Sequence, residues 1–261
     1  MSGLPLPKKS LGQHWLNDEL ALDDIVAAAD LTPDDVVLEV GPGPGALTRR
    51  LVKAAARVVA VELDSQQAAL LPAAVPDKNL EVVQQDILEF DLTALPADYK
   101  VVANIPYYLT SNLIRVLAES TNSPSLAVLL IQKEVAERVA AKPGSTSLLS
   151  ISAQFYFEVS LDQVIKAEAF TPPPKVDSQV VVLRRRPTLL FEVDTKAFFR
   201  LAKAGFAMRR KTLLNSLSAG LHMPKEDVHK ILNQAGLKPT LRAQNLSLQD
   251  WYQLYKALPN S

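Results

Sequence analysis

The sequence predicts an α/β protein: an open, mostly parallel sheet in residues 1–186, followed by a small all-helical domain in residues 187–261. Short apolar runs typical of buried parallel strands recur through the first two thirds of the chain. One of them leads directly into a glycine-rich turn and a helix. Beyond the Arg-Arg-Arg-Pro segment at residues 184–187, the pattern changes to short amphipathic helices.

The composition is that of an ordinary globular protein, with 48% hydrophobic and 21% charged residues among 261. No uninterrupted apolar run approaches about 18 residues and residues 1–10 hold no signal sequence, so we expect a cytoplasmic protein without a membrane segment. The chain has no cysteine, which excludes disulfides, cysteine-based zinc sites, iron–sulfur clusters and thiol nucleophiles. With only three histidines besides, we expect no metal site.

The first elements are a basic arm and a helix. Residues 8–16 read Lys-Lys-Ser-Leu-Gly-Gln-His-Trp-Leu, a basic stretch that ends in polar and aromatic residues. Apolar residues then recur at helical spacing as far as about Ala29, and Asn17 or Asp18 is suited to cap this helix. Taken alone, such an arm is more typical of a disordered tail.

The apolar run at residues 36–40 predicts a buried strand, and residues 41–45, Gly-Pro-Gly-Pro-Gly, lead into a helix at about residues 46–55. A strand, a glycine-rich turn and a helix N-terminus together form a nucleotide-binding turn. The third glycine follows the second by two residues rather than the three of the dinucleotide fingerprint. This spacing favours a nucleoside ligand without a pyrophosphate, such as S-adenosylmethionine, over a loop that binds no ligand.

Two further strands end in acidic residues suited to a nucleoside. Residues 58–63 form the second strand, and Glu62 lies 21 residues after Gly41, where an acid binds ribose hydroxyls. Residues 82–86 form the third strand, and its terminal Asp86 is able to accept a hydrogen bond from an adenine amino group. Asp86 is also compatible with a simple strand-end turn.

The next strand, residues 101–103, runs into Asn104-Ile105-Pro106-Tyr107. Asn104 offers an amide oxygen, and the turn fixed by Pro106 offers rigid carbonyl acceptors. The Tyr107 ring offers a face for base stacking, worth about 1–3 kcal/mol. Such acceptors beside an aromatic ring that stacks on the ligand would hold the exocyclic amino group of a planar base. They would direct the nitrogen lone pair of that group at an electrophile. The alternative is a strand end with a proline turn and two core tyrosines.

The remaining elements complete the sheet and the C-terminal domain. We expect helices at about residues 110–119, 134–140 and 148–157, and strands at 126–132, 159–167 and 176–183. Residues 170–175 are too proline-rich for regular structure. In this loop Phe170 is placed either to cover the far face of a base held by Tyr107 or to pack on the core. The C-terminal helices are expected at residues 195–206, 210–217, 225–234 and 247–258.

The net charge of zero conceals an asymmetry between the two parts. Residues 184–261 carry 14 of the 28 basic and 5 of the 28 acidic side chains, which leaves 14 basic and 23 acidic residues in the preceding part. A basic module beside an acidic one favours polyanion binding. Arg209, Arg210 and Lys211 begin the second C-terminal helix in this prediction and are suited to phosphates, or they form a solvated charged face.

With these motifs in hand, the chain resembles the small-subunit ribosomal RNA adenine dimethyltransferases, relatives of the erythromycin-resistance rRNA methyltransferases. The segments that carry the resemblance are Gly12-Gln13-His14-Trp15-Leu16, Glu39-Val40-Gly41-Pro42-Gly43 with Gly45, Val61-Glu62-Leu63-Asp64, Gln85-Asp86, Asn104-Ile105-Pro106-Tyr107, and Phe170 through Lys175-Val176-Asp177-Ser178. They occur in family order, and the cluster at residues 209–211 is also similar to the family. His14-Trp15 departs from the Asn-Phe of many members.

The resemblance implies a Rossmann-like seven-stranded methyltransferase sheet and an RNA- or ribosome-binding C-terminal domain. It implies S-adenosylmethionine contacts from His14, Leu16, Gly41, Glu62, Asp86 and Asn104. It implies a catalytic role for Asn104, Pro106 and Tyr107, and transfer of two methyl groups to N6 of each of two adjacent adenines near the 3′ end of 16S rRNA. The partner would be the small ribosomal subunit or its assembly intermediate, and we expect a monomer.

Three alternatives remain open at this point. The first is a 23S rRNA methyltransferase that confers antibiotic resistance, which residues 12–13 and 175–178 and the basic C-terminal part disfavour. The second is a non-catalytic ribosome-assembly factor, which an intact Asn104–Tyr107 motif disfavours. The third is a nicotinamide dehydrogenase, which the glycine spacing disfavours.

Overall fold

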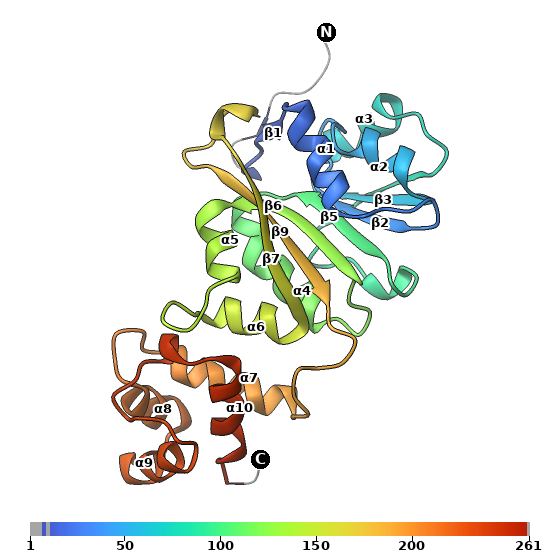
Figure 1. The fold of residues 1–261 in the computed structure, drawn as a ribbon. Coiled ribbons are helices and arrows are strands. Elements are labelled where there is room, and N and C mark those ends of the chain that lie inside the picture. The colour runs from blue at the N-terminus through green and yellow to red at the C-terminus, as the bar shows by residue number, and fades with distance from the viewer. Residues whose placement is uncertain (1–6, 9–10, 260–261) are drawn as a thin grey trace. The chain divides into compact units, whose positions relative to one another are not determined.

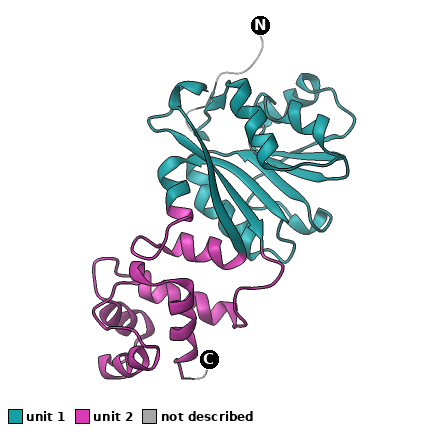
Figure 2. Ribbon diagram, viewed as in Figure 1, with its two compact units in different colours: residues 1–137, 157–185 teal, residues 138–156, 186–261 magenta. Residues whose placement is uncertain are grey.

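The computed structural model describes residues 7–8 and 11–259. Lys9 and Ser10 of the predicted basic arm lie outside the described residues. The chain forms two compact units (Figure 2). Unit 1 comprises Met1–Glu137 and Phe157–Arg185, and unit 2 comprises Arg138–Tyr156 and Arg186–Ser261.

Unit 1 is built on a seven-stranded sheet of order β4-β3-β2-β5-β6-β9-β7 (Figure 1). Its strands are β2 (Val36–Val40), β3 (Arg57–Glu62), β4 (Leu80–Gln84), β5 (Lys100–Asn104), β6 (Leu126–Gln132), β7 (Phe157–Ile165) and β9 (Ser178–Arg185). Strands β2 to β6 pair in parallel, and β9 pairs antiparallel with both β6 and β7. The mostly parallel α/β sheet predicted from the apolar runs is confirmed.

The helices of unit 1 are α1 (Glu19–Ala28), α2 (Thr48–Ala54), α3 (Ser65–Ala74) and α4 (Thr110–Glu119), together with all but the last two residues of α5 (Lys133–Val139). Of the two predicted caps, Asn17 and Asp18, it is Asp18 that caps α1, because its carboxylate accepts hydrogen bonds from the N–H groups of Leu20 at 3.0 Å and Ala21 at 3.1 Å. Helix α3 was not among the elements predicted from the sequence. This helix has no clear apolar stripe and contains Pro72, so its pattern resembles a loop.

The order of the strands indicates where this sheet is expected to bind a ligand. The chain runs outward from β2 through β3 to β4, then returns to β5 on the other side of β2. Right-handed crossovers therefore place α2 and α3 on one face and α4 on the opposite face. The position between β2 and β5, where the direction of winding reverses, is where open α/β sheets bind ligands, at the carboxyl ends of the strands.

A second, two-stranded sheet joins the N-terminal arm to the proline-rich loop. Strand β1 (Trp15–Leu16) pairs antiparallel with β8 (Phe170–Thr171). The backbone N–H of Asn17 also donates to the carbonyl of Ala169 at 2.9 Å. The prediction that residues 170–175 lack regular structure was wrong for the first two, because their pairing partner lies at the other end of unit 1's sequence.

Unit 2 is helical. It contains α6 (Leu148–Tyr156), α7 (Thr195–Phe206), α8 (Leu213–Leu221), α9 (Lys225–Gln234) and α10 (Leu248–Lys256). Its core includes the fully buried Trp251 and a cluster of aromatic rings. The boundary expected at residue 186 assigned residues 138–156 to the first domain, whereas they belong to unit 2. The physical reason is the Phe155 ring, which lies 5.0 Å from Phe198 and 5.4 Å from Phe199.

The basic cluster of unit 2 does not lie in a helix. Helices α7 and α9 match the predicted ranges, but α8 begins at Leu213, so Arg209–Lys211 lie in the turn before it. Thr212 has an extended backbone, and the N–H of Leu213 donates to the carbonyl of Leu241 at 2.6 Å. This tertiary hydrogen bond sets the start of α8 three residues later than the local pattern predicts. Across residues 7–8 and 11–259, no helix has the length and apolar character needed to cross a membrane.

Candidate functional site

A pocket lies at the carboxyl ends of the strands in unit 1. It is lined by the N-terminal arm from residue 11 to 16, the glycine turn, the ends of β3 and β4, and residues 104–109. The structure brings into this one pocket all the residues predicted to hold the cofactor: His14, Leu16, Gly41, Glu62, Asp86 and Asn104. Pro106 and Tyr107 line it as well.

The glycine turn is held by backbone hydrogen bonds and by a buried acid. The N–H of Gly41 donates to the carbonyl of Val61 at 2.9 Å, and Gly41 and Gly43 adopt positive φ angles of 66° and 53°. Glu62 accepts from the N–H of Gly43 at 3.1 Å and from the N–H of Asp64 at 2.8 Å. Burial raises the pKa of Glu62. Glu62 therefore connects the turn after β2 to the start of α3 in one rigid unit.

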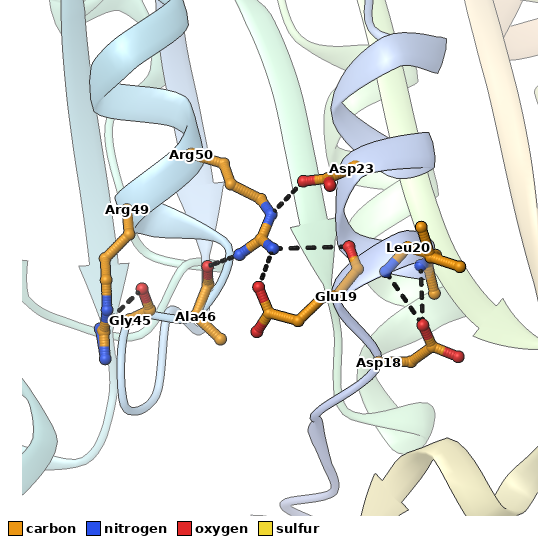
Figure 3. A network of polar contacts seen from close by, with 9 residues as sticks. Asp18, Glu19, Leu20, Asp23, Gly45, Ala46, Arg49 and Arg50 are labelled. Carbon is orange, nitrogen blue, oxygen red and sulfur yellow. Dashed lines mark hydrogen bonds and ion pairs between the residues drawn. The ribbon is translucent and has the colours of Figure 1, made fainter.

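An arginine behind the turn fixes the helices beside it (Figure 3). Arg50 donates from Nε to Asp23 of α1 at 2.6 Å and from Nη1 to the carbonyl of Ala46 at 3.1 Å, and it pairs with Glu19. Arg49 donates to the carbonyl of Gly45 at 3.1 Å. These contacts tie α1, which follows the N-terminal arm, to the segment that follows the glycine turn.

The N-terminal arm is anchored at the pocket by polar contacts. Lys8 Nζ lies 2.8 Å from Oδ1 of Asp64, whose side chain is 1% exposed, and Gln13 Nε2 donates to Oδ2 at 3.4 Å. Burial raises the pKa of Asp64, but hydrogen bonds from Lys8 and from the N–H of Gln66 outweigh it and leave the pKa below its ordinary value. Asn104 Nδ2 donates to the carbonyl of His14 at 3.2 Å. The arm thus spans from the end of β3 to the end of β5.

The end of β5 presents the acceptors expected from the sequence. The amide nitrogen of Asn104 is engaged by His14, and in residues 7–8 and 11–259 its Oδ1 has no hydrogen-bond partner. The carbonyl of Pro106 accepts from the N–H of Leu109 at 3.0 Å, which leaves one of its two lone pairs for another donor. Two acceptors therefore remain available beside the Tyr107 ring.

Tyr107 has two partners that were not predicted from the sequence, Ser178 and His14. Its hydroxyl lies 2.9 Å from the hydroxyl of Ser178, and its ring stacks with His14 at a centroid distance of 5.6 Å and an interplanar angle of 21°. His14 in turn donates from Nδ1 to the carbonyl of Pro172 at 2.7 Å. Burial raises the pKa of Tyr107, and the Ser178 hydrogen bond opposes this rise.

Phe170 does not reach the pocket. Its side chain is 3% exposed and belongs to the hydrophobic cluster of unit 1, together with Leu16, its partner in the β1–β8 pair. The strand pairing directs this ring into the core, so the hypothesis that it covers the far face of a base is not supported by the arrangement seen here. The aromatic ring beside Tyr107 is that of His14.

The remaining predicted residues belong to unit 2. Arg209, Arg210 and Lys211 are exposed, and none of them forms an ion pair with another described residue. The described residues also contain no group of three or more His, Cys, Asp or Glu side chains that could hold a metal ion.

Glu39 is an additional pocket residue with unusual electrostatics. It is 1% exposed, and its Oε2 has no hydrogen-bond partner in the described part of the chain. Burial raises the pKa of Glu39 from 4.5 to about 8; the neighbouring Thr48 hydroxyl opposes this rise, and the negative charge of Glu62 adds to it. The carboxyl therefore holds its proton in the folded protein at pH values where the unfolded chain releases it.

The free energy of unfolding should consequently depend on pH through Glu39. As pH rises from 4.5 towards 8, the stability contributed by the protonated carboxyl is lost, by about 1.4 kcal/mol per pH unit at most. We expect Glu39→Gln, which is neutral throughout, to gain stability relative to the native protein over this range, as measured by urea unfolding at pH 5, 6.5 and 8. The variant Glu89→Gln, at an exposed position, is the matched control. A constant difference between Glu39→Gln and the native protein would contradict the assignment.

These features define the class of protein. A parallel sheet with this switch in strand order, a glycine turn tied to an acid at the end of β3, and an Asn-Ile-Pro-Tyr turn after β5 are those of a Rossmann-like methyltransferase. The chain belongs to the ribosomal RNA adenine dimethylase family, whose model matches residues 6–260. The methyl donor of such a methyltransferase is S-adenosylmethionine.

Curated relatives agree with this assignment over nearly the whole chain. A protein of Dehalococcoides mccartyi named ribosomal RNA small subunit methyltransferase A is 43% identical, and the match covers 95% of this chain and 87% of the relative. A protein of the same name from Nostoc sp. is 41% identical, and the match covers 97% of this chain and 98% of the relative. Another from Bacillus cytotoxicus is 39% identical, over 96% of this chain and 91% of the relative.

Solved structures extend the similarity to the fold. A dimethyladenosine transferase from Plasmodium falciparum has a TM-score of 0.78 and 29% identity, covering 92% of this chain and 96% of its own. The 23S rRNA methyltransferase ErmE has a TM-score of 0.74 and 29% identity, covering 94% of this chain and 99% of its own.

Proposed function

We propose that the protein transfers two methyl groups to N6 of each of two adjacent adenines near the 3′ end of 16S rRNA, in the small ribosomal subunit or its assembly intermediate. The observation that carries this proposal is the single pocket in which the Asn104–Tyr107 turn lies beside the glycine turn and Glu62. The names of the relatives support the small subunit as the substrate. The reaction would serve ribosome biogenesis.

The side chains of the pocket suit a nucleoside methyl donor. Glu62 and Asp86 are acceptors for ribose hydroxyls and for an adenine amino group, and the apolar Leu63 and Leu88 line the same pocket. Gly41, Leu16, His14 and Asn104 would complete the contacts to S-adenosylmethionine. When bound, this group supplies an electrophilic methyl on a sulfonium.

The residues at the end of β5 would hold the target base. An adenine within a helix is inaccessible, so the base has to leave its stack and enter the pocket. The Tyr107 ring face stacks on it, while Asn104 Oδ1 and the Pro106 carbonyl accept the two N–H groups of its amine. Holding both hydrogens orients the nitrogen lone pair, which is catalysis by positioning and electrostatics.

The test is to incubate the protein with labelled S-adenosylmethionine and either unmethylated small subunits or large subunits, and then to locate the modified nucleotides. Label on two adjacent adenines of 16S rRNA is the expected result. Label confined to 23S rRNA would instead support the resistance-type activity, for which the similarity to ErmE is the relevant observation. Binding to subunits without label would indicate an assembly factor.

The basic cluster at residues 209–211 is proposed to contact phosphates. Its exposed side chains lack ion pairs with other described residues, so no internal partner competes for them. Replacing all three with alanine should weaken RNA binding at low salt and reduce the salt slope, d log K/d log[salt], by about two to three. Filter binding at several salt concentrations measures this. Lys230→Ala, which removes an exposed lysine paired with Asp227 at 3.1 Å, serves as the control, and an equal change in its slope would argue against a specific contact.

We further propose that the enzyme works as a monomer in the cytoplasm and needs no metal ion. Activity should then survive dialysis against a chelator. Sedimentation at working concentration should give the mass of one chain.

A further inference from the structure

The segment Lys175-Val176-Asp177-Ser178 supports the family resemblance but has no role in the proposed reaction so far. Ser178 is the first residue of β9 and is fully buried. Its Cα lies opposite Gln132 of β6 on one side and Ile165 of β7 on the other. Ser178 is therefore held between the two strands that flank β9, level with the C-terminal end of β6.

The preceding residue fixes the entry to this strand. The carbonyl of Asp177 accepts from the N–H of Lys133 at 3.0 Å. Its carboxylate accepts from Lys166 Nζ at 2.9 Å and from the N–H of Ala167 at 3.1 Å. Asp177 thus joins the start of α5 to the connection after β7, and this leaves the Ser178 side chain little freedom to move.

The hydroxyl of Ser178 lies 2.9 Å from the hydroxyl of Tyr107, 71 residues away in sequence. Tyr107 begins a short 3₁₀ turn (Tyr107–Leu109) after β5 and is only partly buried. A partly exposed ring on a turn has rotational freedom about its side-chain torsions unless its far end is fixed. Ser178 supplies that fixed point from the sheet.

We infer that Ser178 is a positioning residue, whose hydroxyl fixes the orientation of the Tyr107 ring against which the target adenine stacks. This inference rests on the proposed function. The competing explanation is that Ser178 merely satisfies a buried tyrosine hydroxyl and that the ring face alone matters. That explanation makes Tyr107→Phe neutral, whereas the inference makes it measurably slower.

The two explanations separate in a double-mutant cycle. Ser178→Ala and Tyr107→Phe each remove the same hydrogen bond from opposite ends. Because such a bond contributes modestly, each should lower kcat on unmethylated small subunits by about three- to tenfold, with little change in KM. The double variant should be no slower than the slower single variant. Ser125→Ala, which removes hydrogen bonds to the carbonyls of Asp98 and Tyr99 at the opposite end of β6, should leave kcat unchanged.

A spectroscopic measurement makes the test independent of turnover. In protein labelled with [¹³Cζ]tyrosine, the Tyr107 signal is assigned by its loss in Tyr107→Phe. Ser178→Ala should shift this signal and leave the other tyrosine signals in place, and Ser125→Ala should not shift it. Unchanged thermal unfolding of the variants would show that the fold is retained.

The outcomes distinguish the role of Ser178 from the proposed function. Full activity of Ser178→Ala, an unshifted Tyr107 signal, or losses that multiply in the double variant would each overturn the inference while leaving the proposed function standing. A native protein that fails to methylate small subunits would overturn the proposed function, and the role of Ser178 with it.

Discussion

Replacing Asn104 with alanine should lower the rate of methyl transfer by about 10²–10³-fold, the loss seen when one preorganised polar group is removed from a reacting centre. Binding of the small subunit should change little. The side-chain amide of Asn104 is fixed at its nitrogen, because Nδ2 donates to the carbonyl of His14 at 3.2 Å. This hydrogen bond orients Oδ1 away from that carbonyl, where it is a fixed acceptor. Alanine removes both the acceptor and its orientation.

Single-turnover methylation and equilibrium binding, measured side by side, test this prediction. Asn79→Ala is the matched control. Asn79 Nδ2 bridges the carbonyls of Val52 and Ala55, each at 2.9 Å, just before β4 and thus at the opposite edge of the sheet. This variant should lose stability but keep its rate. Equal losses of rate and of RNA binding in Asn104→Ala would contradict the assigned role.

Tyr107→Ala is expected to weaken capture of the extruded base by about 1–3 kcal/mol, or roughly 5- to 150-fold in kcat/KM. The ring is partly exposed and lines the same pocket as Asn104 and the glycine turn, so truncation removes a stacking face. It also removes the neighbour of the His14 ring. Steady-state kinetics with unmethylated small subunits measure the change.

Tyr107→Phe is the informative comparison, because it keeps the ring and loses only the hydroxyl. It should be tolerated far better than alanine, with no more than the modest loss expected from the missing Ser178 hydrogen bond. If phenylalanine were as damaging as alanine, the hydroxyl rather than the ring face would carry the function, and stacking would be the wrong explanation.

Much of the fold was predictable because its signals are local. Apolar runs marked the strands, and Asp18 marked the start of α1 through its capping side chain. The glycine turn and the Asn104–Tyr107 turn were recognisable because each joins an apolar run to residues with special backbone or hydrogen-bonding properties. Because parallel strands end at one edge of a sheet, both turns line one pocket in the structure.

The errors have a common origin in contacts between distant segments. Phe170 and Thr171 form a strand only because Trp15 and Leu16 pair with them. The start of α8 depends on the carbonyl of Leu241. Helix α3 is stabilised by the packing of Leu71 in the core of unit 1 rather than by its own apolar pattern. None of these determinants lies within the local window in which helical or strand periodicity is visible.

By itself, the sequence determined the class of fold, the strand-end motifs and the chemistry available in them, because propensity, periodicity and turn geometry act over a few residues. Only the tertiary structure decided which residues surround Tyr107. His14 lies on its ring and Ser178 at its hydroxyl, while Phe170 is drawn into the core. These three come from segments that meet Tyr107 only after the sheet has formed, since the order and register of its strands depend on packing across the whole unit.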